Sequence, residues 1–325
     1  MKIKEIILKN RILYTVSRSL IDAVSSIRLH RFISYYKMHK EEYLNKLIKE
    51  NRIVIIKNGK YNYGSFSGFY LNNMIGLTLD ALMSGFIPII KFENINDDGE
   101  RCNCWEDLFA QPCLDKDVAT QNVYEKSNTF FKPAFDYIFS KRRREDWCYI
   151  YNEFVHFNYE TNNYIQQEIE TIIGSKKVLG VICRGTDYVR TKPKYHPIQP
   201  NIETIINDTA QLMRDKVYDA LYLATEDESY YQLFVSKFGK EKVLTNKRTY
   251  YDKLYSQLDD NALLYQISFD RNNDQFLKGR EYLSSIYILS KCDGLIGGHC
   301  GGSDMAIYFN NNRYNYLKIY DIGVY

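Results

Sequence analysis

The sequence predicts an α/β protein made of two successive series of strand–helix–strand units. Short, fully apolar runs alternate with longer segments whose apolar residues recur at helical spacing, as in parallel sheets covered by helices. The first series begins near Asn51 and the second near Lys176. A chain of 325 residues is long enough for two domains that each bury a core. We therefore expect two Rossmann-like domains facing each other across a cleft, one over residues 1–172 and one over residues 173–325.

The first series is indicated by two aliphatic runs. Residues 53–56 (IVII) and 87–92 (IPIIKF) predict parallel strands, and the apolar run that ends at Met83 predicts the helix between them. A turn with two glycines, Gly64 and Gly68, follows the first of these strands. Because ligands of α/β proteins bind at the carboxyl ends of strands, we expect this turn to contact a ligand.

Two further stretches complete the N-terminal half. Residues 93–112 predict an irregular segment. The basic run Lys141–Arg144 predicts a solvated helix end, and a phosphate or acceptor site is the alternative.

The second series contains four predicted strands and four predicted helices. The strands cover residues 178–183, 221–225, 294–296 and 316–320. The helices cover residues 201–216, 229–238, 277–291 and 303–310. Three loops that leave the carboxyl ends of these strands carry the candidate site residues.

The first loop is Arg184-Gly185-Thr186-Asp187, directly after the strand VLGVIC. An arginine there offers a permanently charged fork of donors that suits phosphate oxygens. Asp187 would orient the arginine or a sugar hydroxyl. The alternative is a structural Arg–Asp pair that braces the loop.

The second loop, residues 296–304 (IGGHCGGSD), runs from a strand into a helix. Its four glycines permit close backbone approach, and the free N–H groups of a helix start bind anions, so we expect this turn to cradle a diphosphate. The alternative is a tight turn with Ser303 or Asp304 as the N-cap. The motif is neither a Walker P-loop nor a G-x-G-x-x-G fingerprint.

The third loop contains Glu226 and Asp227. These acids would accept hydrogen bonds from ribose or sugar hydroxyls, or they simply cap the following helix. No group of cysteines or histidines has zinc-ligand spacing, so we expect no metal.

The composition fits a globular protein with nearly balanced charge. The formal net charge is +3, whereas a nucleic-acid partner would require a larger basic excess. The seven cysteines, an odd number, cannot all pair in disulfides. The N-terminus lacks a secretory signal, and no apolar run of about 18 residues could span a membrane. We expect a cytoplasmic protein that binds no nucleic acid.

The segment from Met1 to about Phe32 alternates basic with apolar residues. Its cations are Lys2, Lys4, Lys9, Arg11, Arg18 and Arg28. A basic amphipathic helix could rest peripherally on an anionic membrane. The alternative is an ordinary helix with a solvated cationic face.

Four blocks in the second half resemble the α-1,6-fucosyltransferases and protein O-fucosyltransferases. Residues 178–189 (VLGVICRGTDYV), followed by His196-Pro197-Ile198, are similar to the family pattern G-V-H-V-R-R-T-D with H-P-I at the same spacing. Residues 222–228 (YLATEDE) resemble Y-L-A-T-D-D-P. Residues 289–293 (LSKCD), before the glycine-rich turn, resemble L-S-x-x-D.

The resemblance implies a GT-B fold, a GDP-linked sugar donor, usually GDP-fucose, and inversion at the anomeric carbon without a catalytic metal or cofactor. It implies that Arg184 holds the β-phosphate and stabilises the departing GDP. Backbone groups of Gly301, Gly302 and Ser303 match the second phosphate contact.

The chain also departs from the family pattern. Gly185 stands where the family has a second arginine, and Ile182 replaces a histidine whose backbone contacts guanine. The aspartate that reads guanine falls at Ser285, and Glu281, one turn away, is the candidate substitute. On the acceptor side, Tyr188 stands for a lysine and Lys192 for a glutamate, while His196 is retained.

We therefore expect an inverting glycosyltransferase of polysaccharide biosynthesis that moves fucose, or a related deoxyhexose, to a glycan or lipid-linked oligosaccharide. The catalytic residues would be Arg184 and Asp187, with Glu106 or Asp107 as other candidates for the base. The rivals are a transferase for another nucleotide sugar and a non-catalytic nucleotide- or glycan-binding protein of the same fold.

Overall fold

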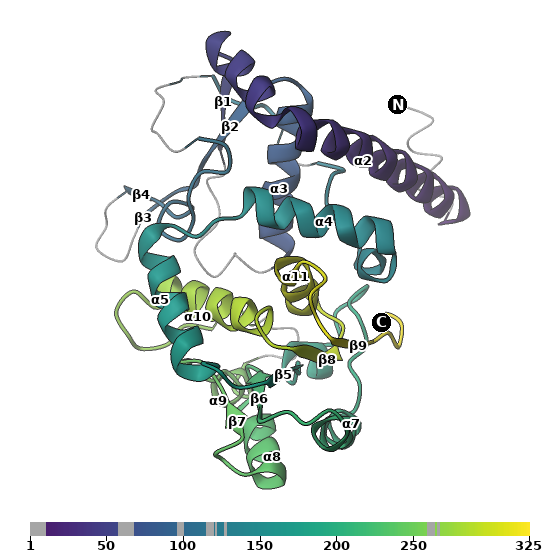
Figure 1. The fold of residues 1–325 in the computed structure, drawn as a ribbon, viewed down its shortest axis with the longest axis vertical. Coiled ribbons are helices and arrows are strands. Elements are labelled where there is room, and N and C mark those ends of the chain that lie inside the picture. The colour runs from purple at the N-terminus through teal and green to yellow at the C-terminus, as the bar shows by residue number, and fades with distance from the viewer. Residues whose placement is uncertain are drawn as a thin grey trace.

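The computed structural model describes residues 11–57, 68–95, 101–114, 120, 122–126, 129–258, 264 and 267–325. Its C-terminal half contains a five-stranded, wholly parallel sheet in the order β7-β6-β5-β8-β9 (Figure 1). The strands are β5 (Val178–Ile182), β6 (Ala220–Ala224), β7 (Val243–Leu244), β8 (Gly294–Gly298) and β9 (Tyr316–Tyr320). The predicted α/β class, with parallel strands, is confirmed.

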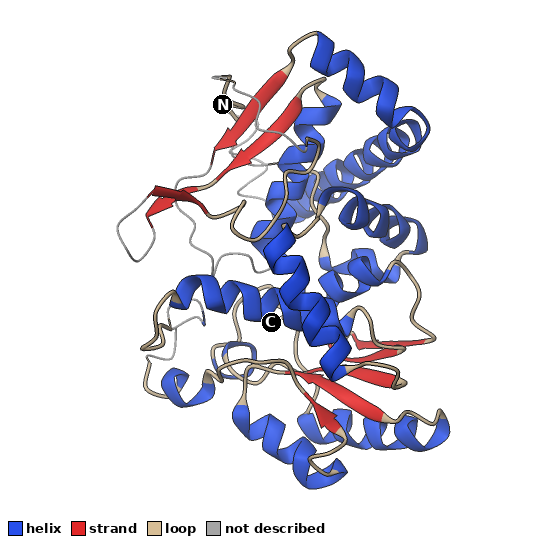
Figure 2. Cartoon of the chain, turned by 60° about the vertical axis from the view of Figure 1, so that its left-hand side comes forward, coloured by secondary structure: helices blue, strands red, loops and turns tan. Residues whose placement is uncertain are grey.

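Helices lie on both faces of this sheet (Figure 2). They are α7 (Ile202–Asp215), α8 (Glu228–Phe238), α10 (Asp274–Leu289) and α11 (Gly301–Asn310), with the short α6 (Asp187–Arg190) and α9 (Asp252–Tyr255) between them. Alternate residues of β5 enter different cores: Leu179 and Val181 pack in one apolar cluster, and Val178 and Ile182 in another. Both faces of β5 are covered by apolar clusters, so every position along this strand has to be apolar.

The N-terminal half carries a smaller parallel pair, β1 (Ile53–Lys57) and β2 (Ile87–Lys91), joined through α3 (Gly68–Met83). A bridge between Ile55 and Val123 adds a further parallel contact. The prediction of an irregular segment after β2 was wrong in part, because β3 (Glu93–Ile95) and β4 (Arg101–Asn103) form an antiparallel pair. These strands are only three residues long and lack alternating apolar residues, so periodicity could not reveal them.

Four helical segments complete this half. They are α2 (Arg11–Lys49), the 3-10 helix η2 (Phe135–Phe139), α4 (Lys141–Phe154) and α5 (Tyr159–Ile172). The helix predicted to end near Phe32 continues to Lys49, with a kink at His39, where the backbone is non-helical. Among the described helices, none is both long and apolar enough to pass through a bilayer.

Helix α11 of the C-terminal half packs against α4 and α3 of the N-terminal half. The rings of Tyr151 and Tyr308 lie 5.1 Å apart, and Asn152 Nδ2 donates to the Tyr308 carbonyl at 3.0 Å. These contacts fix the C-terminal end of α11 against the N-terminal half. The predicted boundary between residues 172 and 173 falls in the connection between α5 and β5, and it stays a prediction.

Candidate functional site

The candidate site lies where the strand order of the large sheet reverses. From β5 the chain proceeds to β6 and β7 on one side, and it then returns to β8, which pairs with the other edge of β5. In open α/β sheets this reversal opens a crevice at the carboxyl ends of the two central strands. Arg184 follows β5 and the glycine-rich turn follows β8, so two of the predicted loops leave neighbouring strands at this point.

The Arg184 guanidinium is held by two carboxylates and an aromatic ring. Its Nη2 donates to Asp187 Oδ1 at 2.7 Å, its Nη1 lies 3.3 Å from Glu226 Oε2, and its Cζ lies 5.0 Å from the centre of the Tyr188 ring. Burial alone would lower the pKa of Arg184, but Glu226 and Asp187 raise it well above its usual value. The side chain keeps 19% of its surface exposed, so this cation is fixed in place while part of it faces solvent.

Glu226 organises the loop that carries Arg184. Its Oε1 accepts from the N–H groups of Gly185 and Thr186 at 2.9 and 3.1 Å and from Thr186 Oγ1 at 2.8 Å. Burial acts to raise the pKa of Glu226, but Arg184 and these donors lower it below its ordinary value. In this structure Thr186 and Glu226, both predicted to bind the donor, are therefore bonded to each other.

Gly185 is required by its neighbours. A Cβ at this position would lie 2.5 Å from Asp227 Oδ2 and 2.9 Å from Tyr230 Cε2. This explains why a glycine stands where the resembling family has a second arginine. Because Asp227 and Tyr230 fill the space beside the Gly185 Cα, an arginine side chain does not fit there, and Arg184 is the single arginine of this turn.

Asp227 lies beside this turn as the N-cap of α8. Its Oδ1 accepts from the Tyr230 N–H at 3.2 Å and from Ser229 Oγ at 2.5 Å. Burial raises the pKa of this carboxyl, while these two donors oppose the rise. The capping role considered in the sequence analysis is present, and donor binding by Asp227 stays a prediction.

Helix α11 begins directly after β8, with Cys300 as its N-cap. Ser303 Oγ both accepts from the Cys300 N–H at 2.9 Å and donates to the Cys300 carbonyl at 2.8 Å. The expectation that Ser303 or Asp304 is the N-cap was therefore wrong, because Ser303 occupies the reciprocal third position of the cap. Burial raises the pKa of the Cys300 thiol, and nearby Arg184 opposes this rise together with the N–H groups of Ser303 and Gly302.

The predicted phosphate-binding residues of α11 are closely packed. Gly302 has no room for a side chain without tight contact, because an added Cβ would lie 2.9 Å from Ile286 Cδ1 and 3.1 Å from Ile182 Cδ1. Ile182 itself ends β5 and is buried. Gly301 is the first helical residue and directly follows Cys300, whose thiol lies close enough to Arg184 to interact with its charge.

A buried histidine–aspartate pair behind this turn was missed by the sequence analysis. His299 Nε2 lies 3.1 Å from Asp304 Oδ1, and both side chains are almost fully buried. Phe139 packs edge-on against the imidazole, with ring centres 5.4 Å apart. Burial raises the pKa of Asp304, while His299 opposes the rise. The sequence signal is the five-residue spacing across a helix start, which is too common to single out a pair.

The predicted acceptor-side residues belong to the segment that follows Arg184, and Tyr188 lies next to its guanidinium. The ring of His196 meets the ring of Tyr188 edge-on at 5.4 Å, and Tyr188 lies against the arginine. Lys192 is exposed, and its N–H donates to the Asp187 carbonyl at 3.1 Å. The C-terminal residues border this loop, because Pro197 and Val324 form an antiparallel bridge.

Ser285 and Glu281, the two residues predicted to read the base, are both hydrogen-bonded to other protein side chains. Ser285 is buried, and its hydroxyl accepts from Tyr222 at 3.2 Å. Glu281 binds Arg271, whose Nη1 lies 2.6 Å from Oε1. Asn246 Nδ2 donates to the Glu281 carbonyl at 3.0 Å and so connects α10 to the loop after β7.

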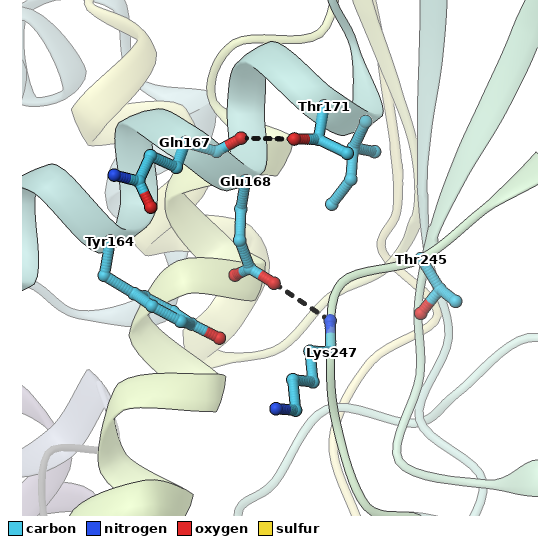
Figure 3. A pocket seen from close by; sticks show the side chains of 7 residues that line it. Tyr164, Gln167, Glu168, Thr171, Thr245 and Lys247 are labelled. Carbon is cyan, nitrogen blue, oxygen red and sulfur yellow. Dashed lines mark hydrogen bonds between the residues drawn. The ribbon is translucent and has the colours of Figure 1, made fainter.

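A cavity of about 300 Å³ lies between α5 and the loop after β7. It is formed by Tyr164, Gln167, Glu168, Thr171 and Ile172 of α5 and by Thr245 and Lys247 after β7 (Figure 3). Glu168 accepts from the Lys247 N–H at 3.0 Å and is also bonded to the Ser284 hydroxyl. One lining residue, Glu168, therefore contacts α10 at Ser284, next to the predicted base-reading residue Ser285.

The remaining predicted residues lie away from these contacts or outside the described residues. Gly64 lies outside them, and Gly68 begins α3. Glu106 and Asp107 belong to the turn after β4, where Glu106 Oε1 accepts from Gln111 Nε2 at 2.7 Å. Among the described residues, no three metal-ligating side chains of Cys, His, Asp or Glu come together.

Two arginines of the basic run at residues 141–144 connect α4 to other segments of both halves. Arg143 lies 3.1 Å from Asp22 of α2, and Arg144 donates to the Asn312 side chain, just after α11, at 2.9 Å. Arg143 and Arg144 thus bond to other protein side chains. Two of the cations that the alternative interpretation assigned to a phosphate site are therefore already bonded within the protein.

No protein-family model matches the chain, and no curated protein sequence is similar to it. The fold is similar to solved fucosyltransferases. These include NodZ from Bradyrhizobium (11% identity, 75% of this chain and 87% of that chain, TM-score 0.41) and POFUT1 in complex with GDP (9%, 84% and 99%, 0.48). They also include a variant of Arabidopsis thaliana FUT1 in complex with GDP (10%, 87% and 76%, 0.42). The motifs of the second half resemble the same group of enzymes.

Proposed function

We propose that this protein is an inverting glycosyltransferase that moves fucose, or a related deoxyhexose, from GDP to a hydroxyl of a glycan. The observation that carries the proposal is the position of Arg184 and the start of α11. They follow two neighbouring parallel strands at the point where the strand order reverses. A fixed cation opposite a helix N-terminus is suited to a diphosphate, since both stabilise negative charge.

In this proposal the acceptor hydroxyl attacks the anomeric carbon as the bond from that carbon to the β-phosphate oxygen breaks. Negative charge develops on the departing GDP, and Arg184 stabilises it from a position set before the reaction by Asp187 and Glu226. Preorganisation of this kind means that the arginine does not have to be reoriented during the reaction. The first N–H groups of α11 hold the other side of the diphosphate.

Asp187 has two roles in this mechanism. Its Oδ1 accepts from Arg184 and from the Tyr188 N–H at 3.0 Å. Among the described residues both hydrogen bonds to this carboxylate use Oδ1, so Oδ2 is the atom that takes the proton of the acceptor hydroxyl. Tyr188 and His196 then form the adjoining wall for the acceptor.

A donor with a base other than guanine is the second candidate. The observation that favours it is the engagement of both base-reading candidates, Ser285 by Tyr222 and Glu281 by Arg271. Guanine presents two neighbouring N–H donors that a free carboxylate would accept. The cavity beside α5 gives room for a base, and its acceptors, such as Glu168, do not by themselves select guanine.

Thermal shifts with GDP, UDP, ADP and CMP, followed by hydrolysis and transfer assays with GDP-fucose, test the proposal. Selective binding of GDP should stabilise the chain by about 2.7 kcal/mol at a hundredfold excess over the dissociation constant. Selective stabilisation by another nucleotide would favour the second candidate. Selective GDP binding without any turnover would instead identify a non-catalytic binding protein.

A further inference from the structure

The outer face of α2 exposes a stripe of large apolar side chains. Leu20, Val24, Ile27 and Met38 expose 62%, 55%, 45% and 72% of their surface. Their spacings of four, three and eleven residues place them on one side of a helix with 3.6 residues per turn. The opposite side of α2 carries the buried residues Leu29, Ile33 and Tyr36. The helix is therefore apolar on two faces, and only one of them packs against the protein.

This outer face lies at the edge of the molecule. Figure 1 shows α2 along the outside of the N-terminal half, with α3 and α4 on its inner side. Two more apolar side chains, Ile21 and Tyr35, border the stripe and are each exposed by 46%. A contiguous apolar surface of this kind is unusual on a monomeric protein and indicates an interaction site.

Between Lys9 and Lys40 the charges of this helix are almost all positive, and the exposed acids Glu41 and Glu42 follow beyond Met38. Arg28, Arg31 and Lys37 are exposed on this part of the helix. Asp22 is the single acid between Lys9 and Lys40. It is held by Arg143 at 3.1 Å and by the Tyr137 hydroxyl at 2.6 Å, so its charge is compensated. The surface therefore combines apolar side chains with three cations that form no ion pair with a carboxylate among the described residues.

We propose that this stripe, with Arg28, Arg31 and Lys37, docks on a membrane surface rich in anionic phospholipids. Apolar side chains of an interfacial helix enter the boundary between headgroups and acyl chains, while flanking cations bind the anionic headgroups. The long stems of Arg and Lys let their charges reach the headgroup level from the edge of an apolar face. Helix α2 would lie in the membrane plane and hold the catalytic half close to that surface.

A second copy of the chain fits this face less well. A coiled-coil seam along the stripe would use positions 20, 24, 27, 31, 34 and 38, and two of these are Arg31 and Ser34. Both seam positions of a heptad need apolar residues for stable pairing. The arginine that would be buried in such a seam is instead favourable at a lipid headgroup.

Vesicle co-sedimentation of the full chain tests the proposal. We expect binding to vesicles of equal parts phosphatidylglycerol and phosphatidylcholine to exceed binding to pure phosphatidylcholine by roughly a hundredfold at low salt. The variant Val24→Glu with Ile27→Glu should bind at least about tenfold more weakly, because it places carboxylates in the apolar stripe. The matched control is Leu233→Glu, at an apolar residue of α8 that is exposed by 46%; it should bind like the wild type.

A second pair of variants separates the charges from the apolar stripe. Arg28→Glu with Arg31→Glu should abolish the preference for anionic vesicles, whereas Lys240→Glu with Lys242→Glu, two exposed lysines of the other half, should retain it. If the glutamates in the stripe lower the melting temperature, Val24→Ser with Ile27→Ser replaces them. Equal binding to both vesicles, or unchanged binding of the stripe variants, would overturn the proposal. So would a dimer in sedimentation equilibrium that the stripe variants dissociate.

Discussion

The Arg184 guanidinium lies 3.3 Å from the Glu226 carboxylate, and this pair joins the loops that leave two neighbouring strands, β5 and β6. The same carboxylate holds the backbone of Gly185 and Thr186. Glu226 therefore positions the cation that the proposed function depends on.

Glu226→Gln should destabilise the fold by about 2 kcal/mol at neutral pH, because a buried charged acceptor is replaced by a neutral one. The pKa of Glu226 is lowered in the folded state. Its stabilisation is therefore complete above the ordinary carboxyl value of 4.5 and is lost as the pH falls through the lowered folded value. Urea unfolding at several pH values should show the difference between wild type and variant shrinking in acid. Glu228→Gln, which removes a partly exposed partner of Lys253, is the control and should change little.

Gly185→Ala should destabilise the protein by about 1–3 kcal/mol, since the new methyl group would meet Asp227 Oδ2 at 2.5 Å. The free energy of unfolding of the double variant Gly185→Ala with Asp227→Ser tests whether crowding against Asp227 is the cause of this loss. Serine keeps the N-cap of α8 but removes the crowded carboxylate. The loss in the double variant should be smaller than the sum of the two single losses. Strict additivity would show that the crowding is not at Asp227.

Glu281→Gln distinguishes the two candidate donors. If Glu281 leaves Arg271 to accept the N–H groups of guanine, the affinity for GDP should fall at least about tenfold, while the weak affinity for UDP should not change. Calorimetric titration of both nucleotides checks this. Ser285→Ala should leave GDP binding unaltered, because the serine hydroxyl is buried against Tyr222. Equal loss of GDP and UDP binding by Glu281→Gln would show that the residue does not read the base.

The central strands of the larger sheet were predictable from the sequence because they are short, wholly apolar runs, whereas the two-residue β7 was not predicted and β9 includes Lys318. Residues 178–182 and 220–224 are buried throughout, so an unbroken apolar run was the expected pattern. The position of Arg184 followed from the same pattern, since a residue just after a buried parallel strand lies at the ligand edge of the sheet. The short strands β3 and β4 carried no such signal.

The partners of the site residues could not be predicted, because they depend on contacts between distant segments. Glu226 binds a loop about forty residues earlier in the chain, and His299 packs against Phe139 of the other half. Cys300 as an N-cap also contradicts residue preference, which favours Ser or Asp at that position. The reciprocal bonds of Ser303 explain the exception, since they satisfy the backbone of Cys300 from within the helix.

The most direct test of the proposed function is titration of GDP and of guanosine into the wild type and into Arg184→Lys. Lysine retains a positive charge beside Asp187 and Glu226 but loses the fork of donors that can span phosphate oxygens. We predict that the wild type prefers GDP to guanosine by roughly a hundredfold and that Arg184→Lys loses at least about tenfold of this preference. Arg214→Lys, an exposed arginine of α7, should behave like the wild type. An unchanged preference in Arg184→Lys would contradict the assignment of this arginine to the diphosphate.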